Sequence, residues 1–206
     1  MTIIIAPTVA GLIFDLDGTL ADTMALHYAA WHETFTAYGI TCPQAFLESL
    51  NGVPTEIIVT YFNETFGYCL DPVQFAKEKE MRARAKLPQA RTIPLVAAVV
   101  HNNRGRLPMA VATGGNLANA EIILQAIDMV SCFEALITAD DSVLPKPAPD
   151  IFLEAARRLH VEPYHCQVFE DADCGLEAAR KAGMFTTDVR LLLQGPDTTG
   201  GIAKRP

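Results

Sequence analysis

The feature that most constrains this chain is a short apolar run that ends in two closely spaced carboxylates. Residues 9–14 read Val-Ala-Gly-Leu-Ile-Phe, without alternation of polar and apolar side chains. This pattern is typical of a strand buried on both faces of a parallel sheet. Asp15 and Asp17 follow, and Gly18 permits a sharp turn close to a bound anion. Because ligands of open α/β sheets bind at the carboxyl ends of the strands, we expect a polar site there.

The second half of the chain alternates between strand and helix patterns. Four more strands are expected at 108–112, 135–139, 167–169 and 184–189. Helices are expected at 93–103, from after residue 116 to 129, at 149–159 and at 173–182. Right-handed crossovers then favour a sheet with the strand order 3-2-1-4-5. The sequence therefore predicts an α/β fold with a Rossmann-like doubly wound parallel sheet.

The segment after the first strand reads as helical instead. Apolar residues recur there at three- and four-residue spacing from Met24, with Asp22 as the expected N-cap. Further helices are expected at 43–50, 55–66 and 72–87. We therefore predict a core domain of residues 1–20 and 88–206 and an inserted helical cap domain of residues 21–87. Beyond Leu193 the sequence indicates a loose tail.

Composition excludes several classes of function. The chain has 206 residues, half of them hydrophobic, and a net charge of −8, which argues against nucleic-acid or anionic membrane partners. Its five cysteines form no CxxC motif, so neither a disulfide framework nor a zinc site is expected. Neither a signal peptide nor a membrane span is expected. We expect a cytoplasmic monomer that binds a small phosphorylated substrate.

Polar residues recur where the expected strands end. Thr113 follows the second strand, Lys146 the third, and Glu170 and Asp171 end the fourth. In the expected strand order these residues converge on Asp15, and carboxylate oxygens are the ligands that Mg²⁺ prefers. Each residue also has a simpler explanation: an N-cap for Thr113 or for the two acids, and a solvated side chain for Lys146.

Four motifs together resemble the haloacid dehalogenase superfamily: DLDGT at 15–19 with the preceding apolar residues, ATGGN at 112–116, KPAP at 146–149 and EDADCGLEAARKAGM at 170–184. The last motif and the inserted cap are similar to the β-phosphoglucomutase branch. Residues 50–55, 106–111 and 169–192 resemble bacterial fructose-1-phosphate phosphatases of that branch. The resemblance implies Mg²⁺-dependent sugar-phosphate hydrolysis.

The resemblance also implies roles for individual residues. Asp15 is the expected nucleophile and Asp17 the general acid and base, while Thr113, Lys146 and backbone N–H groups near Gly114 are expected to hold the phosphoryl group. Gly114 and Asn116 are expected to bind the substrate. The residues expected at the metal are Asp15, Asp17, Glu170 and Asp171, with the side chain of Asp17 left free for proton transfer. Chemistry supports this assignment, because the charge of a phosphate dianion must be offset before a carboxylate can attack it.

Five cap residues match substrate-contacting positions of the same branch: His27, Trp31, Asn51, Thr55 and Lys79. Trp31 could equally pack inside the cap. The mutases of the branch have a lysine and an arginine in place of Asn51 and Thr55, which argues against mutase activity here. The alternatives are a hexose-phosphate mutase, a non-catalytic phosphosugar-binding protein and a metal-free dehalogenase.

Overall fold

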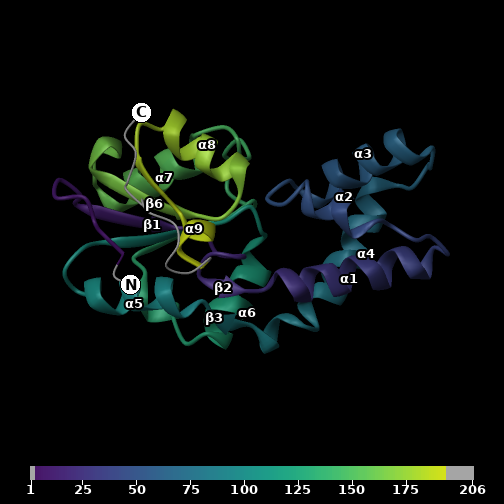
Figure 1. Cartoon of the computed structure of the whole chain (residues 1–206), viewed down its shortest axis with the longest axis horizontal. Coiled ribbons are helices and arrows are strands. Elements are labelled where there is room, and N and C mark those ends of the chain that lie inside the picture. Colours follow the sequence, from purple (N-terminus) through teal and green to yellow (C-terminus); the bar gives the residue numbers. More distant parts are fainter. Residues whose placement is uncertain (1–2, 194–206) are drawn as a thin grey trace.

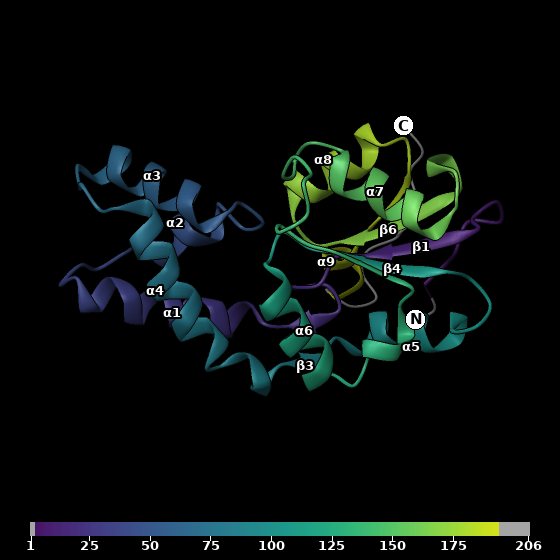
Figure 2. The same ribbon diagram turned by 180° about the vertical axis from the view of Figure 1, so that it is seen from behind.

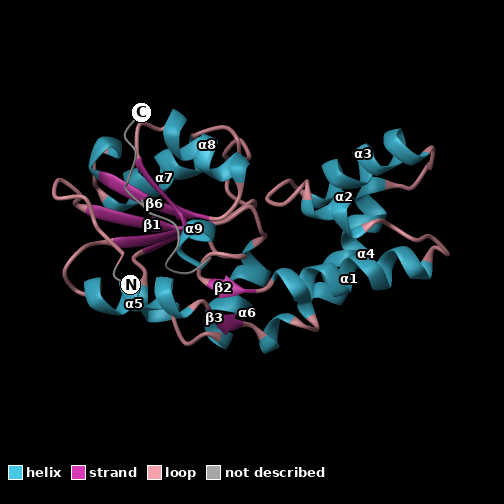
Figure 3. Ribbon diagram, viewed as in Figure 1, coloured by secondary structure: helices cyan, strands magenta, loops and turns pink. Residues whose placement is uncertain are grey.

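The computed structural model describes residues 3–193 and contains a five-stranded parallel sheet in the order β5-β4-β1-β6-β7. Figure 3 shows the strands in magenta between the helices. The strands are β1 (Gly11–Phe14), β4 (Met109–Ala112), β5 (Ala135–Ile137), β6 (Cys166–Glu170) and β7 (Phe185–Asp188). This is the predicted order 3-2-1-4-5, so the expected α/β fold is confirmed. The first strand lies at the centre of the sheet, where both of its faces are covered.

Helices cover both faces of the sheet (Figures 1 and 2). The helices are α5 (Pro94–Asn103), α6 (Leu117–Ala126) and α9 (Val189–Leu193) on one face, and α7 (Asp150–Leu159) and α8 (Asp173–Lys181) on the other. Leu12 and Phe14 pack toward the first group, and Ile13 packs toward the second. The unbroken apolar run therefore reflects a strand between two apolar layers.

The remaining helices lie to one side of the sheet (Figure 1). They are α1 (Met24–Ala37), α2 (Gln44–Glu48), α3 (Thr55–Phe66) and α4 (Pro72–Arg84). They share an apolar cluster of their own, in which the ring of Phe35 lies 4.6 Å from that of Phe62 and 4.7 Å from that of Phe75. We call residues 21–87 the cap, although the exact boundaries of the two domains stay a prediction.

The chain enters and leaves the cap through two short strands that pair with each other. Strands β2 (Ala21–Asp22) and β3 (Arg91–Thr92) form an antiparallel ribbon beside the sheet. The expected N-cap at Asp22 is wrong, because Asp22 belongs to this ribbon and α1 begins at Met24 with Thr23 as its N-cap. A helix signal read from neighbouring residues contains no information about a pairing partner about 70 residues away in sequence.

Other differences from the expectations are small. Strand β5 stops at Ile137, and α4 stops at Arg84, before a 3₁₀ turn at Leu87–Gln89. Two further 3₁₀ turns are Val130–Cys132 and Pro163–His165. None of the helices formed by residues 3–193 has the length and apolar character needed to cross a bilayer. The tail expected beyond Leu193 lies outside the described residues.

Candidate active site

The carboxyl ends of the strands bring the predicted polar residues to one edge of the sheet. Asp15 follows β1, and Thr113 follows β4, which pairs with β1. Glu170 ends β6, which pairs with β1 on its other side. The backbone N–H of Asp15 donates to the carbonyl of Phe169 at 3.0 Å, so the sheet itself fixes the position of the first aspartate.

Lys146 lies buried between two of these carboxylates. Its Nζ donates to Oδ1 of Asp15 and to Oε2 of Glu170, at 2.7 Å in each case. Burial alone would lower the pKa of Lys146, but the charges of the two acids outweigh this effect and raise it. The alternative of a solvated lysine is therefore wrong.

Asp15, Glu170 and Asp171 form an acidic cluster whose ligand oxygens lie within 4.8 Å of one another. Burial raises the pKa of Asp15 to about 6, that of Glu170 to about 7 and that of Asp171 to about 6. Three carboxylates against the single charge of Lys146 leave an excess of negative charge in a buried place. Oxygen donors and this excess charge fit a divalent cation such as Mg²⁺.

Thr113 and Asn116 follow β4 in different roles. The hydroxyl of Thr113 accepts from the backbone N–H of Gly115 at 3.0 Å. Asn116 is the N-cap of α6, and its side chain accepts from the backbone N–H of Asn119 at 3.0 Å. The helix-cap explanation of Thr113 is therefore wrong, and it holds for Asn116 instead. Contacts of Gly114 and Asn116 with a substrate stay predictions.

Glu170 and Asp171 also had a simpler explanation as a capping pair. The N-cap of α8 is Ala172, and Oε1 of Glu170 accepts from the backbone N–H groups of Asp171 and Ala172 at 3.1 and 2.9 Å. One oxygen of Glu170 therefore does bind the start of the helix. Its other oxygen faces Lys146, so capping accounts for only half of this carboxylate.

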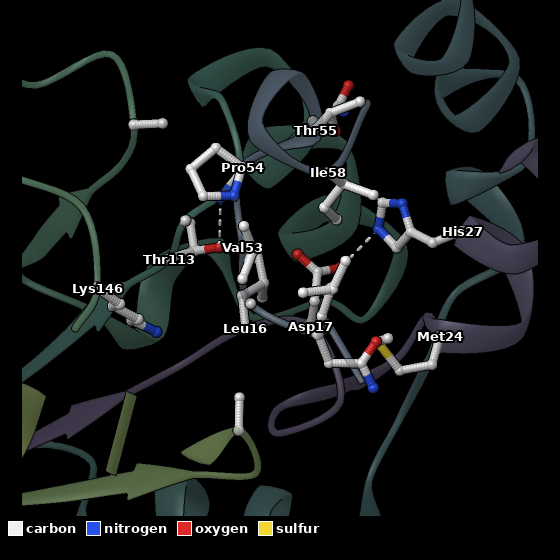
Figure 4. Close-up of a pocket in the computed structure, with 18 of the residues that line it drawn as sticks. Leu16, Asp17, Met24, His27, Val53, Pro54, Thr55, Ile58, Thr113 and Lys146 are labelled. Carbon is white, nitrogen blue, oxygen red and sulfur yellow. Dashed lines mark hydrogen bonds and ion pairs between the residues drawn. The ribbon is translucent and has the colours of Figure 1, made fainter. Parts of the chain in front are cut away.

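Asp17 faces the cap rather than the acidic cluster. Its Oδ1 accepts from the hydroxyl of Thr23 at 2.6 Å and lies 3.0 Å from Nε2 of His27, toward which it points in Figure 4. Burial opposes ionisation of Asp17, but the charge and hydrogen bonds of His27 and the bond from Thr23 lower its pKa. This orientation leaves the carboxylate free of the acidic cluster. A place for Asp17 at the metal stays a prediction.

The cap wall of the site is built around Glu80, which the sequence analysis missed. Nζ of Lys79 lies 2.9 Å from Oε1 of Glu80 and 3.3 Å from Nδ1 of His27. Thr55 donates to the same Oε1 at 3.1 Å, and the amide of Asn119 donates to Oε2 at 2.6 Å. The predicted residues Lys79, His27 and Thr55 are thus brought together through a residue that was not predicted.

Other residues missed from the sequence are Thr23, Tyr28 and Asn119. Tyr28 donates to Oδ1 of Asn51 at 2.9 Å. One signal was available for Asn119, because it lies one turn after Asn116 at the start of a helix that follows a site strand. No local signal marks Glu80, whose partners come from three separate helices.

Trp31 packs inside the cap. It is 5% exposed, stacks on Phe35 and lies against Phe75. The ammonium of Lys79 lies 5.4 Å from the centre of its ring. The packing alternative for Trp31 is therefore confirmed, and a substrate contact at its edge stays a prediction.

One cavity of about 320 Å³ lies between the sheet edge and the cap. Every residue predicted for the site borders it: Asp15, Asp17, His27, Trp31, Asn51, Thr55, Lys79, Thr113, Gly114, Asn116, Lys146, Glu170 and Asp171. Figure 4 shows Thr113 and Lys146 on the core side and His27 and Thr55 on the cap side. The cavity therefore has an acidic end at the sheet, with Lys146 among the carboxylates, and an end at the cap that carries the Lys79–Glu80 ion pair.

Comparisons with known proteins agree with this geometry. Residues 12–189 match the family model described as haloacid dehalogenase-like hydrolase. The chain is 45% identical to fructose-1-phosphate phosphatase YqaB of Escherichia coli, over 89% of this chain and 97% of that protein. It is 28% identical to β-phosphoglucomutase of Bacillus subtilis, over 86% of this chain and 82% of that protein. The crystal structure of a β-phosphoglucomutase from Clostridium difficile is similar, with a TM-score of 0.78 and 26% identity, over 87% of this chain and 84% of that one.

Proposed function

Because this chain belongs to the haloacid dehalogenase-like hydrolase family, and to its β-phosphoglucomutase-like branch, we propose that it hydrolyses small sugar phosphates such as fructose-1-phosphate. The observation that carries the proposal is the carboxylate of Asp15, which is fixed at the end of the central strand, bound to Lys146 and open to the cavity. The extent of identity to the E. coli phosphatase supports the choice of substrate class.

Asp15 acts as the nucleophile. One of its oxygens forms a bond to phosphorus while the bond between phosphorus and the sugar oxygen breaks, which leaves an aspartyl phosphate. Water then attacks the phosphorus, the bond to Asp15 breaks, and inorganic phosphate leaves. A metal-free dehalogenase would have no use for Glu170 and Asp171 beside this aspartate.

The charge of the phosphate is met by groups that surround Asp15. Lys146 contributes a buried positive charge, and the hydroxyl of Thr113 and backbone N–H groups near Gly114 donate to phosphoryl oxygens. Asp15, Glu170 and Asp171 would hold Mg²⁺, which when bound supplies positive charge that offsets the repulsion between the phosphate and the attacking carboxylate. Asp15, Thr113 and Glu170 lie at strand ends, and the loop residue Lys146 is held by its bonds to Asp15 and Glu170, so the orientation of these groups is set before the substrate binds.

Asp17 transfers the protons. It lies two residues from the nucleophile and outside the acidic cluster, so its carboxylate can reach the leaving oxygen. In its protonated form Asp17 gives a proton to the departing alkoxide, and the carboxylate that remains then takes a proton from the attacking water, which restores the acid. The hydrogen bonds from Thr23 and His27 hold Asp17 in place for both steps.

The Asp15→Asn variant tests this mechanism. We expect it to lose all phosphate release from fructose-1-phosphate and p-nitrophenyl phosphate, because an amide cannot form the acyl phosphate. Asp17→Asn should lose about 10²- to 10⁴-fold in kcat, the usual contribution of acid and base catalysis. The control is Asp22→Asn, an exposed aspartate of the β2–β3 ribbon. Measurable turnover by purified Asp15→Asn protein would disprove the covalent mechanism.

A further inference from the structure

We infer that Glu80, with Thr55 and Asn119, forms a subsite that binds hydroxyl groups at the cap end of the cavity and disfavours a second phosphate. The inference rests on the proposed function and specifies its substrate class. The enzyme would act on monophosphorylated sugars or polyols whose far end carries free hydroxyls, and it would discriminate against bisphosphates. We call these three residues the hydroxyl subsite.

The hydroxyl subsite joins three helices that are distant in sequence. Glu80 belongs to α4, Thr55 begins α3, and Asn119 belongs to α6 of the core. Asn119 is 3% exposed, and its Oδ1 accepts from Nε of Arg84 at 3.2 Å. That bond turns the amide nitrogen of Asn119 toward Glu80. The subsite is therefore assembled from both walls of the cavity.

The subsite retains hydrogen-bonding capacity for a ligand. An ionised carboxylate offers about four lone-pair positions, and Glu80 uses three of them on Thr55, Lys79 and Asn119. The hydroxyl of Thr55 donates its proton to Glu80, and its oxygen still offers lone pairs as an acceptor. The amide of Asn119 has a second N–H with no acceptor among residues 3–193. Acceptors and a donor side by side suit the hydroxyl groups of a sugar.

The charge of Glu80 changes what Lys79 can bind. A lysine facing a cavity alone would form a strong charge-assisted bond to phosphate. Here Nζ of Lys79 is 2.9 Å from a carboxylate that also faces the cavity. Although burial opposes it, the charge and hydrogen bond of Lys79 lower the pKa of Glu80, so this carboxylate is ionised. A phosphate at this end would meet a negative charge beside Lys79, the only lysine of residues 21–79 that borders the cavity.

Glu80→Gln tests the inference, because glutamine keeps the shape and removes the charge. For wild type and variant, kcat and KM are measured with fructose-1-phosphate, fructose-1,6-bisphosphate and p-nitrophenyl phosphate. We expect the preference of kcat/KM for the monophosphate over the bisphosphate to fall by about ten- to hundredfold, mainly through KM, as is usual for loss of a charged hydrogen bond. The decrease in kcat/KM should also be larger for fructose-1-phosphate than for p-nitrophenyl phosphate, which has no sugar hydroxyls.

Glu78→Gln is the matched control. Glu78 lies on the same helix, accepts from Tyr38 and Gln74, and does not border the cavity. Its variant should keep the wild-type preference. Thr55→Val is the second variant, and we expect it to weaken fructose-1-phosphate binding without improving the bisphosphate. Thr55→Val supplies the test if circular dichroism shows that Glu80→Gln does not fold.

Three outcomes would overturn the inference. If p-nitrophenyl phosphate is hydrolysed but Glu80→Gln keeps the wild-type preference, the hydroxyl subsite is wrong while the phosphatase proposal stands. If Glu80→Gln lowers kcat/KM equally for all three substrates, Glu80 serves only to hold the cap together. If the wild-type protein releases phosphate from none of the three substrates, the proposed function is wrong, and so is the inferred hydroxyl subsite.

Discussion

At the scale of single residues, Lys146 offsets the negative charge of the buried carboxylates in the site. Its ammonium is the only cation in direct contact with the acidic cluster among residues 3–193, and it lies between Asp15 and Glu170. Removing one partner of a buried ion pair leaves the others uncompensated, which costs more than the pair itself contributes. We therefore expect the same lysine to stabilise the folded protein, in addition to its proposed role at the phosphoryl group.

We predict that Lys146→Met lowers the free energy of unfolding at pH 7.5, without added metal, by about 3 kcal/mol. The measurement is urea unfolding in the presence of chelator. The control is Lys181→Met, whose half-exposed pair with Glu177 should be worth less than about 1 kcal/mol. Equal stability of the two variants would show that Lys146 is not needed to offset the buried carboxylates.

The loss of stability caused by Lys146→Met should depend on pH. Burial raises the pKa of Asp15 to about 6 and that of Glu170 to about 7 in the folded protein. Between pH 4 and 7 the folded state therefore holds protons that the unfolded chain has lost, so stability falls as the pH rises through this window. We expect the deficit of Lys146→Met to be smaller at pH 5.5 than at pH 7.5, because protonated acids no longer need the lysine.

At the scale of elements, the approach of α8 to the end of β6 shapes the acidic cluster. A Cβ atom on Gly175 would lie 2.0 Å from Oε2 of Glu170, the oxygen that binds Lys146. A Cβ atom on Gly18 would lie 2.3 Å from Oδ2 of Asp171. Both carboxylates therefore occupy space that only glycine leaves open. Helix and strand meet too closely there for any side chain.

We predict that Gly175→Ala loses Mg²⁺ binding. Alanine is favoured over glycine inside a helix by about 1 kcal/mol, but the clash with Glu170 outweighs this gain and displaces the carboxylate. The measurement is the rise in melting temperature on adding Mg²⁺, which should largely vanish. Gly39→Ala is the control, because Gly39 has a φ of +71° and open space around it. It should lower stability by about 1 kcal/mol and keep the response to Mg²⁺.

At the scale of the whole molecule, the cap joins the core through two chain crossings that pair as the β2–β3 ribbon. A pair of short strands can bend as one unit, so closure of the cap over the site is a natural motion for this architecture. Thr23 follows the ribbon directly and bonds to Asp17. A movement of the ribbon would therefore shift Thr23 relative to Asp17, the residue proposed to transfer protons.

We predict that the protein becomes more compact when Mg²⁺ and beryllium fluoride, a mimic of the phosphoryl group, are added together. Closure would bring the cap against the core and expel water from the cavity. The measurement is the radius of gyration by small-angle X-ray scattering, with Asp15→Asn protein as the control because it cannot bind the mimic covalently. Superimposable curves with and without the additions would contradict closure.

We predict that the chain hydrolyses hexose phosphates rather than isomerising them. A mutase must hold a bisphosphate intermediate in two orientations, with cap cations on the phosphate that is not reacting. Residues 21–76 contain no lysine or arginine, and Lys79 is paired with Glu80.

The assay supplies β-glucose-1-phosphate with a catalytic amount of glucose-1,6-bisphosphate and follows both glucose-6-phosphate and inorganic phosphate. Formation of glucose-6-phosphate faster than inorganic phosphate would reverse this prediction. The Asp15→Asn variant is the control, and it should form neither product.

The sequence by itself determined the sheet and the strand-end residues. A short apolar run without alternation that ends in turn residues is typical of a doubly covered strand, and polar residues at corresponding strand ends meet once the crossovers are right-handed. Asp15, Thr113 and Glu170 follow from these two rules, whereas Lys146 lies in the loop between β5 and α7. The periodicity of the cap helices also followed, because the apolar stripes of α1 and α3 are local properties of the chain.

Tertiary structure alone decided the cap wall and the connections. Glu80 acquires its role from Thr55 and Asn119, which lie 25 and 39 residues away in sequence. Asp22 joined the β2–β3 ribbon instead of capping a helix because its pairing partner is Arg91. A hydrogen bond between side chains from different helices depends on distances that exist only after the apolar faces have packed, and no local pattern encodes those distances.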